Sequence, residues 1–153
     1  MSSHNIEWEV FDSPVNRNTV TEVENLLQVR FPEDFIIYAQ QYHGGFPDKT
    51  EFNFTNVDGT KGLSGFDELL SFNTQRSNYI VEIYNSLSQS YFPKGIIPFG
   101  GEASGNYVCF DYRNNPAKPF IVLWQHDKHV SESVIYVADS FTDFLQMLYE
   151  PID

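Results

Sequence analysis

The stretch that decides the fold is residues 96–137, which read IIPFGGEASGNYVCFDYRNNPAKPFIVLWQHDKHVSESVIYV. Four short runs in it are rich in β-branched and aromatic residues, and glycine, asparagine, proline and aspartate separate them, as is typical of turns. These runs are Ile96–Phe99, Tyr107–Tyr112, Phe120–Trp124 and Val134–Val137. The pattern predicts an antiparallel meander of four strands.

Helical periodicity lies on both sides of this meander. Apolar residues recur at three- and four-residue spacing after Thr19, between Pro32 and Gly44, over Ile80–Leu87 and after Ser140. Each recurrence predicts one helix. Thr19 and Glu22 have the spacing of a capping box, so the first helix is expected to begin with Thr19 as its cap.

Two further segments precede the third predicted helix. Phe52 and Phe54 alternate with polar residues, which predicts a half-buried strand ending in a turn at Asp58-Gly59. Segment Lys61–Phe72 has no single period, and its interpretation is a short strand followed by a turn of helix.

The order of these elements predicts an α+β fold. We expect an antiparallel sheet of about five to six strands with helices packed mainly on one side. The length of 153 residues suits a single domain, expected over residues 6–152, with residues 1–5 as a flexible tail.

Charge narrows the classes of partner. The chain carries 21 Asp and Glu against 9 Lys and Arg, a formal net charge of −12. Nucleic acids and anionic membranes are bound largely through Lys and Arg, so direct binding to either is not expected. A basic protein partner fits this charge, although an acidic surface can also serve solubility alone.

The location is expected to be cytoplasmic. No apolar run approaches the ~20 residues that span a bilayer, and the first ten residues lack the basic start of a signal peptide. Cys109 is the single cysteine and cannot form an internal disulfide.

Three segments in order carry a family resemblance. They are Phe31–Phe35 leading to His43-Gly44-Gly45, then Ile97–Asp111, and finally Val137–Leu145. Together they resemble the SUKH superfamily, which includes fungal cell-wall synthesis regulators of the Smi/Knr type and many bacterial immunity proteins. Two positions depart from the pattern: His43 replaces the usual Asn before the double glycine, and the Gly common between the first two helices is replaced in Val29-Arg30.

This resemblance implies a domain without enzymatic activity. In bacteria such domains typically neutralise a toxin, often a nuclease, and in fungi they act as interaction modules. The acidic composition agrees, because a nuclease must present Lys and Arg to phosphate and an acidic protein can cover that surface. We therefore expect an immunity protein that neutralises a basic nuclease toxin. The alternative is a regulatory interaction module without a toxin partner, and a hydrolase is a weaker third hypothesis.

Acidic residues that face a partner should lie in loops, away from helix caps. Six residues meet this description: Asp58, Asp67, Glu68, Glu102, Asp127 and Glu132. For each one an ordinary solvated position is the competing interpretation, since few interface residues carry much binding energy. The sequence does not specify an oligomeric state.

Other motifs have simpler structural explanations. The glycine-rich stretch Gly100–Asn106 lacks the Gly-Lys-Ser/Thr ending of a phosphate loop and precedes a strand, so it is interpreted as a turn. His126 and His129 are three residues apart, unlike the four-residue spacing of a zinc helix, and fit a polar turn. Cys109 is interpreted as a buried structural thiol. No catalytic residue, metal or cofactor is expected.

Overall fold

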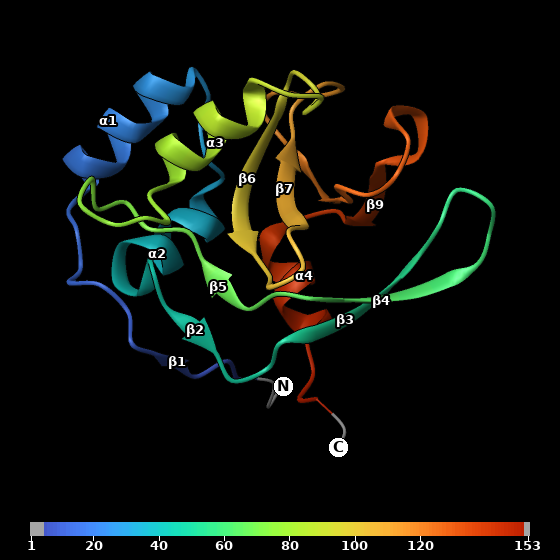
Figure 1. Cartoon of the computed structure of the whole chain (residues 1–153). Helices are drawn as coiled ribbons and strands as arrows, with labels where there is room; N and C mark the ends of the chain where they lie inside the picture. Colours follow the sequence, from blue (N-terminus) through green and yellow to red (C-terminus); the bar gives the residue numbers. More distant parts are fainter. Residues whose placement is uncertain (1–4, 152–153) are drawn as a thin grey trace.

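The computed structural model describes residues 5–151 and has the expected α+β architecture (Figure 1). Its helices are α1 (Arg17–Leu27), α2 (Glu33–Tyr42), α3 (Ile80–Ser88), the short 3-10 helix η1 (Val130–Glu132) and α4 (Phe141–Met147). Its strands are β1 (Trp8–Glu9), β2 (Phe46–Pro47), β3 (Glu51–Thr55), β4 (Lys61–Gly65), β5 (Glu68–Leu69), β6 (Ile96–Gly101), β7 (Tyr107–Asp111), β8 (Phe120–Trp124) and β9 (Val134–Ala138). The expected tail lies outside the described residues except for Asn5, whose carbonyl accepts a hydrogen bond from Lys49 at 2.6 Å.

The main sheet has five strands in the order β5-β6-β7-β8-β9, with antiparallel neighbours. Strands β6 to β9 are the predicted meander, which is therefore confirmed. Two smaller sheets, β1-β2 and β3-β4, complete the fold. Segment Lys61–Phe72 forms β4 and then β5, so the expected turn of helix was wrong.

The main core lies between the sheet and helices α2 and α4. Alternate residues of β6 and β7, including Phe99 and Phe110, face this core, where Phe35 of α2 and Phe141 of α4 contact them. The opposite face of the sheet carries a smaller cluster that contains Cys109. Cys109 is buried there, as predicted, and burial raises the pKa of its thiol well above its ordinary value.

Helix α1 begins earlier than the capping-box pattern predicts. Asn16 is its N-cap, and the Asn16 side chain accepts a hydrogen bond from the Thr19 amide at 3.1 Å. The predicted cap at Thr19 was wrong because Asn16 satisfies the free amide and places Thr19 inside the first turn.

The end of α1 is a turn of the kind that glycine usually occupies. Gln28, the C-cap, has a left-handed backbone with φ of 60°, and its amide donates to the carbonyl of Glu24. Glycine adopts this conformation without steric cost, whereas other residues are strained there. The chain therefore keeps the turn and accepts backbone strain at an exposed glutamine.

Replacing Gln28 with glycine is expected to stabilise the protein. Glycine at this position removes the strain of the left-handed backbone, but it also makes the unfolded chain more flexible, which offsets part of the gain. The net result should be a rise in the free energy of unfolding of about 0.5–1 kcal/mol. Urea unfolding would measure the change. Asn25→Gly is a matched control on the exposed, helical part of α1, where glycine should instead cost about 0.5–1 kcal/mol. Equal losses in both variants would contradict the strain assigned to Gln28.

Candidate partner-binding surface

One end of the main sheet gathers most of the predicted acidic residues. Strands β6 and β8 end there, and β7 and β9 begin there, because neighbouring strands are antiparallel. Strand β5 begins at the same end, where Glu68 pairs with Gly101. We call the five acidic residues at this end the acidic rim: Asp67, Glu68, Glu102, Asp127 and Glu132. Glu68 lies in β5 and Glu132 in η1, so the prediction of a loop position was wrong for these two.

Asn106 joins the two halves of the acidic rim. Its amide donates to Glu102 Oε1 at 2.9 Å, and its side-chain Oδ1 accepts from the amide of His126 at 3.1 Å. The β6-β7 turn is thus held against the β8-β9 loop, which carries Asp127 and Glu132. Topology and this one side chain therefore bring the acids of the β6-β7 turn and of the β8-β9 loop to the same end of the sheet.

Hydrogen bonds fix three rim carboxylates in place. Asp67 Oδ2 accepts from the amide of Ala103 at 3.0 Å, and Glu68 Oε1 accepts from the side chain of Asn78 at 2.8 Å. Glu102 also accepts from the hydroxyl of Ser104. Asp67 and Glu102 line a shallow hollow of about 300 Å³. These hydrogen bonds hold the three carboxylates in fixed orientations within the protein.

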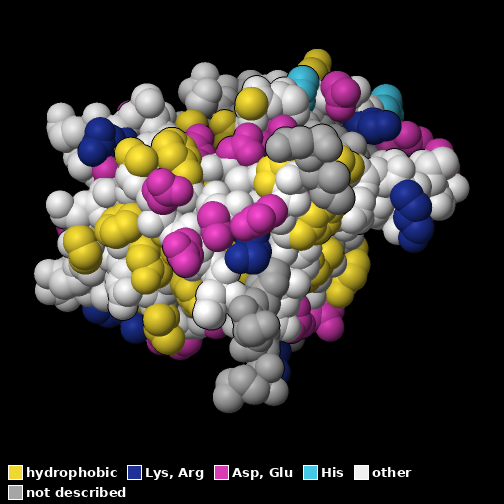
Figure 2. Space-filling view, turned by 90° about the horizontal axis from the view of Figure 1, so that it is seen from below, with side chains coloured by type: hydrophobic (Ala, Val, Ile, Leu, Met, Phe, Trp, Pro, Cys, Tyr) yellow, Lys and Arg dark blue, Asp and Glu magenta, His cyan; other side chains and the backbone are white. Residues whose placement is uncertain are grey.

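No rim carboxylate forms an ion pair with a Lys or Arg among residues 5–151. Figure 2 shows one face of the molecule on which Asp and Glu side chains gather near the middle beside a Lys or Arg side chain, and further Asp or Glu, Lys or Arg, and His side chains lie near its edge. Several other acids are already engaged: Arg17 pairs with Glu33, and Arg113 pairs with Asp111. Each such pair removes one negative and one positive charge together, so the excess of acidic residues stays unpaired, and the rim carboxylates are part of that excess.

Asp58, the sixth predicted residue, lies in the β3-β4 hairpin and not at the end of the main sheet. Its carboxylate accepts from the amide of Thr60 at 3.0 Å and from the Thr60 hydroxyl at 2.7 Å. These hydrogen bonds, with a smaller contribution from Lys128, hold the pKa of Asp58 below its ordinary value. The carboxylate of Asp58 therefore shapes the hairpin turn.

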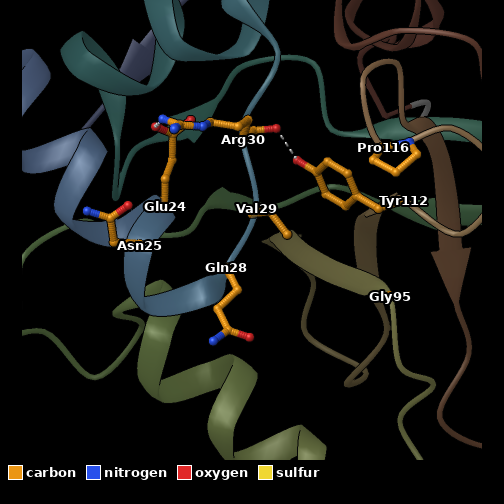
Figure 3. A pocket seen from close by; sticks show the side chains of 8 residues that line it. All are labelled: Glu24, Asn25, Gln28, Val29, Arg30, Gly95, Tyr112 and Pro116. Atoms are coloured by element: carbon orange, nitrogen blue, oxygen red, sulfur yellow. Dashed lines mark hydrogen bonds and ion pairs between the residues drawn. The ribbon is translucent and has the colours of Figure 1, made fainter.

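A larger hollow of about 620 Å³ lies between the α1-α2 connection and the end of β7 (Figure 3). Its ionisable groups hold the fold together. The buried carboxylate of Glu24 accepts from the amide of Phe31 at 2.6 Å, and the Tyr112 hydroxyl donates to the carbonyl of Arg30 at 2.9 Å. Burial, with a smaller effect of Glu24, raises the pKa of Tyr112. These contacts connect α1 to the sheet.

Asp12, His43 and Ser71 converge in the interior and have the residue types of a hydrolytic triad. Their arrangement differs from one, because the Ser71 hydroxyl donates to Asp12. His43 Nδ1 accepts from the amide of Phe72 at 2.9 Å, and its Nε2 donates to the carbonyl of Ser13 at 2.8 Å. Both ring nitrogens are occupied and all three side chains are buried. This cluster anchors the N-terminal segment to the double-glycine turn, and sequence analysis did not identify it.

The remaining motifs have structural roles. Gly100–Asn106 contains the end of β6 and the turn into β7. His129 caps η1, since its Nδ1 accepts from the amide of Ser131 at 3.2 Å. In the part of the chain that the structure describes, no three His, Cys, Asp or Glu side chains are grouped to hold a metal ion. Within residues 5–151, no helix is long and apolar enough to cross a membrane.

Asp67→Asn is expected to stabilise the protein slightly at neutral pH. Burial raises the pKa of Asp67, and the nearby charge of Glu102 raises it further, so the ionised carboxylate disfavours the folded state. Asparagine still accepts from Ala103 without that charge. The gain should be below about 1 kcal/mol, a melting-temperature rise of no more than roughly 2–4 °C.

The gain from Asp67→Asn should also depend on pH. It should be present at pH 7 and disappear as the pH falls through the raised pKa of Asp67, because the carboxyl is then neutral in the folded and unfolded states alike. Thermal unfolding at several pH values would measure this. If Asp67→Asn stabilised the protein more at acidic pH than at pH 7, the raised pKa of Asp67 would be contradicted.

Comparisons with known proteins identify one matching family and one similar protein. The sequence profile described as the SMI1 / KNR4 family (SUKH-1) matches residues 14–147. The chain is also similar to the SPbeta prophage-derived uncharacterized protein YokK of Bacillus subtilis (strain 168), with 34% identity over 159 residues. That alignment covers 91% of this chain and 78% of the relative.

Proposed function

Because the chain belongs to the SMI1 / KNR4 family (SUKH-1), we propose that it is a non-catalytic immunity protein that neutralises a basic toxin. The toxin is a nuclease in this proposal, and the protein acts in the cytoplasm. The prophage origin of the relative YokK agrees with a role in conflict between genetic elements.

One observation carries this proposal: five carboxylates without basic partners lie at the same end of the sheet. Such a surface attracts a partner rich in Lys and Arg and accelerates encounter through long-range steering. A nuclease presents these residues to the phosphates of its substrate. The acidic rim would therefore occupy the substrate-binding surface as an electrostatic substitute for nucleic acid.

Co-expression with the product of a neighbouring toxin gene tests the proposal in cells. The wild-type protein should restore growth, whereas a rim variant carrying Glu102→Gln, Asp127→Asn and Glu132→Gln should protect poorly. Loss of three favourable charges is expected to weaken binding by about 100-fold, or about 2.7 kcal/mol. Glutamine at position 102 still accepts from Asn106, so the rim keeps its shape.

The matched control variant carries Glu22→Gln, Glu82→Gln and Glu150→Gln, which removes the same charge from helices α1 and α3 and from the C-terminal segment. It should protect as well as the wild type. Equal protection by the rim variant would overturn the role of the rim. Failure of the wild type to bind or protect would favour a regulatory interaction module.

A further inference from the structure

A hollow of about 470 Å³ lies between the β8-β9 loop and the segment that follows α3. The same loop carries Asp127 and Glu132 of the acidic rim. Much of the lining is apolar or aromatic: Trp124 is half-buried, whereas Tyr91 is 80% exposed and Val130 is 56% exposed. The hollow therefore shares a loop with the surface that is proposed to meet a partner.

Gln125, which also lines the hollow, carries an unpaired donor. The residue is 6% exposed, and its side-chain Nε2 is buried without a hydrogen-bond partner in the described part of the chain. The backbone of Gln125 is engaged on both sides, because its amide donates to the carbonyl of Ser133 at 2.8 Å and its carbonyl accepts from the amide of Lys128 at 3.3 Å. Buried donors in folded proteins nearly always have an acceptor, and leaving one unpaired costs free energy. The fold thus fixes Gln125 in place and leaves its side-chain donor unused.

Other polar groups that line the hollow are donors too. His129 Nδ1 accepts from the amide of Ser131 at 3.2 Å, so the neutral ring carries its proton on Nε2. The Lys128 ammonium donates only. The last torsion of a glutamine side chain is broad, so the Gln125 amide can turn toward an oxygen in the hollow without a change of backbone. An occupant that suits the hollow therefore brings an acceptor oxygen.

This chemistry selects among the side chains that a partner can offer. Lys and Arg only donate, and Lys128 repels them, so the cations of a basic partner fit Asp127 and Glu132 instead. A carboxylate would approach past these two acids and lose its hydration against Trp124 and Tyr91. Ser, Thr, Asn and Gln can accept but bring little apolar surface. Tyrosine combines an aromatic ring with a hydroxyl oxygen that accepts.

We propose that a tyrosine of the basic partner enters this hollow, where its ring packs on Trp124 and Tyr91 and its hydroxyl oxygen accepts from Gln125 Nε2. Tyrosine is enriched among the few residues that dominate binding energy, and such residues lie in pockets surrounded by weaker contacts that exclude water. Asp127 and Glu132 supply part of that surround. The inference rests on the proposed function for the nature of the partner and adds an apolar anchor to the charges of the rim.

Three small probes test the hollow on the wild-type protein: N-acetyl-tyrosinamide, N-acetyl-phenylalaninamide and N-acetyl-lysinamide. Titrations followed by NMR would monitor the indole N–H of Trp124 and the side-chain amide of Gln125. The tyrosine probe should shift both signals and bind about fivefold more tightly than the phenylalanine probe, because only tyrosine brings the acceptor oxygen. The lysine probe should shift neither signal. Equal affinity for the tyrosine and phenylalanine probes, or unchanged signals with both, would overturn the proposal.

Gln125→Met isolates the hydrogen bond. Methionine is flexible and apolar and leaves no buried donor unpaired, so the variant should be at least as stable as the wild type. It should bind the tyrosine and phenylalanine probes within about twofold of each other, because the donor is gone. Gln41→Met on the exposed side of α2 is the matched control and should keep the preference for tyrosine. A preference for tyrosine that persists in Gln125→Met would refute the role of Gln125.

Tyr91→Ala keeps the test decisive if Gln125→Met does not fold. The Tyr91 side chain is 80% exposed, so its removal should leave the fold intact. The tyrosine probe should bind this variant about threefold more weakly, because one aromatic wall of the hollow is lost. Unchanged affinity in Tyr91→Ala would overturn the proposed packing of the ring.

These probe measurements are separable from the immunity proposal. The tyrosine probe is uncharged, so it should bind the rim variant and the wild type within about threefold of each other. A preference for the tyrosine probe in a protein that does not protect from a toxin would disprove the immunity function alone. Protection by a protein that binds the tyrosine and phenylalanine probes equally would disprove the tyrosine anchor alone.

Discussion

Phe35→Ala is expected to lower the free energy of unfolding by about 3–5 kcal/mol, a large part of the about 5–15 kcal/mol that stabilises an ordinary domain. Phe35 is 1% exposed and lies at the centre of the aromatic core. Its ring contacts five others at centroid distances of 5.0–6.4 Å, namely Phe31, Phe72, Phe99, Phe110 and Phe141. Alanine would leave a cavity between α2, α4 and the sheet.

Urea unfolding followed by fluorescence or circular dichroism would measure this loss. Ile37→Ala is the control on the same helix, where the side chain is 60% exposed and truncation should cost less than about 1 kcal/mol. If both variants lost a similar free energy of unfolding, the packing of α2 on the core would not depend on Phe35.

Asp12→Ala is expected to cost about 2–4 kcal/mol, because it removes the acceptor at the centre of a buried polar cluster. Asp12 accepts from the Ser71 hydroxyl and, at 2.8 Å, from Arg76 Nε, and its amide donates to the carbonyl of His43. Without the carboxylate, the fully buried Ser71 hydroxyl loses its acceptor. The N-terminal segment would then separate more easily from the double-glycine turn.

Arg76→Ala is the matched control for Asp12→Ala. The Arg76 side chain is 59% exposed, so its removal should cost less than about 1 kcal/mol. The free energies of unfolding of both variants and of the double variant would be compared. A loss in Asp12→Ala no larger than in Arg76→Ala would contradict the role of Ser71 in this cluster.

The predictable parts of the fold were those with a local periodic signal. Strands β6 to β9 are runs of five or six residues rich in β-branched and aromatic side chains, and turn residues separate them. Strands β1 and β2 have two residues each, and they pair across a long separation, with Trp8 opposite Pro47, so no period reveals them. The cap of α1 was misplaced because Asn16 and Thr19 both carry side chains that can cap a helix.

The candidate surface was predictable in composition but not in arrangement. Loop positions were sufficient to select Glu102 and Asp127, whereas their proximity depends on the strand order and on Asn106, which holds the two loops together. The polar cluster was missed for the same reason, since Asp12 and Ser71 are 59 residues apart. Asp58 was selected with the others because sequence does not show that Thr60 engages its carboxylate.

The central claim is that the acidic rim binds a basic partner, and the dependence of affinity on salt tests it most directly. The experiment measures the dissociation constant of the complex with the neighbouring toxin, for the wild type and for the rim variant. The salt concentration is raised from about 50 mM to about 500 mM, because the Debye length shortens severalfold over this range. The account predicts that wild-type affinity falls steeply with salt and that the rim variant binds more weakly with a clearly flatter dependence. The role of the acidic rim would be contradicted if affinity depended on salt equally in the two proteins, or if wild-type affinity did not change with salt.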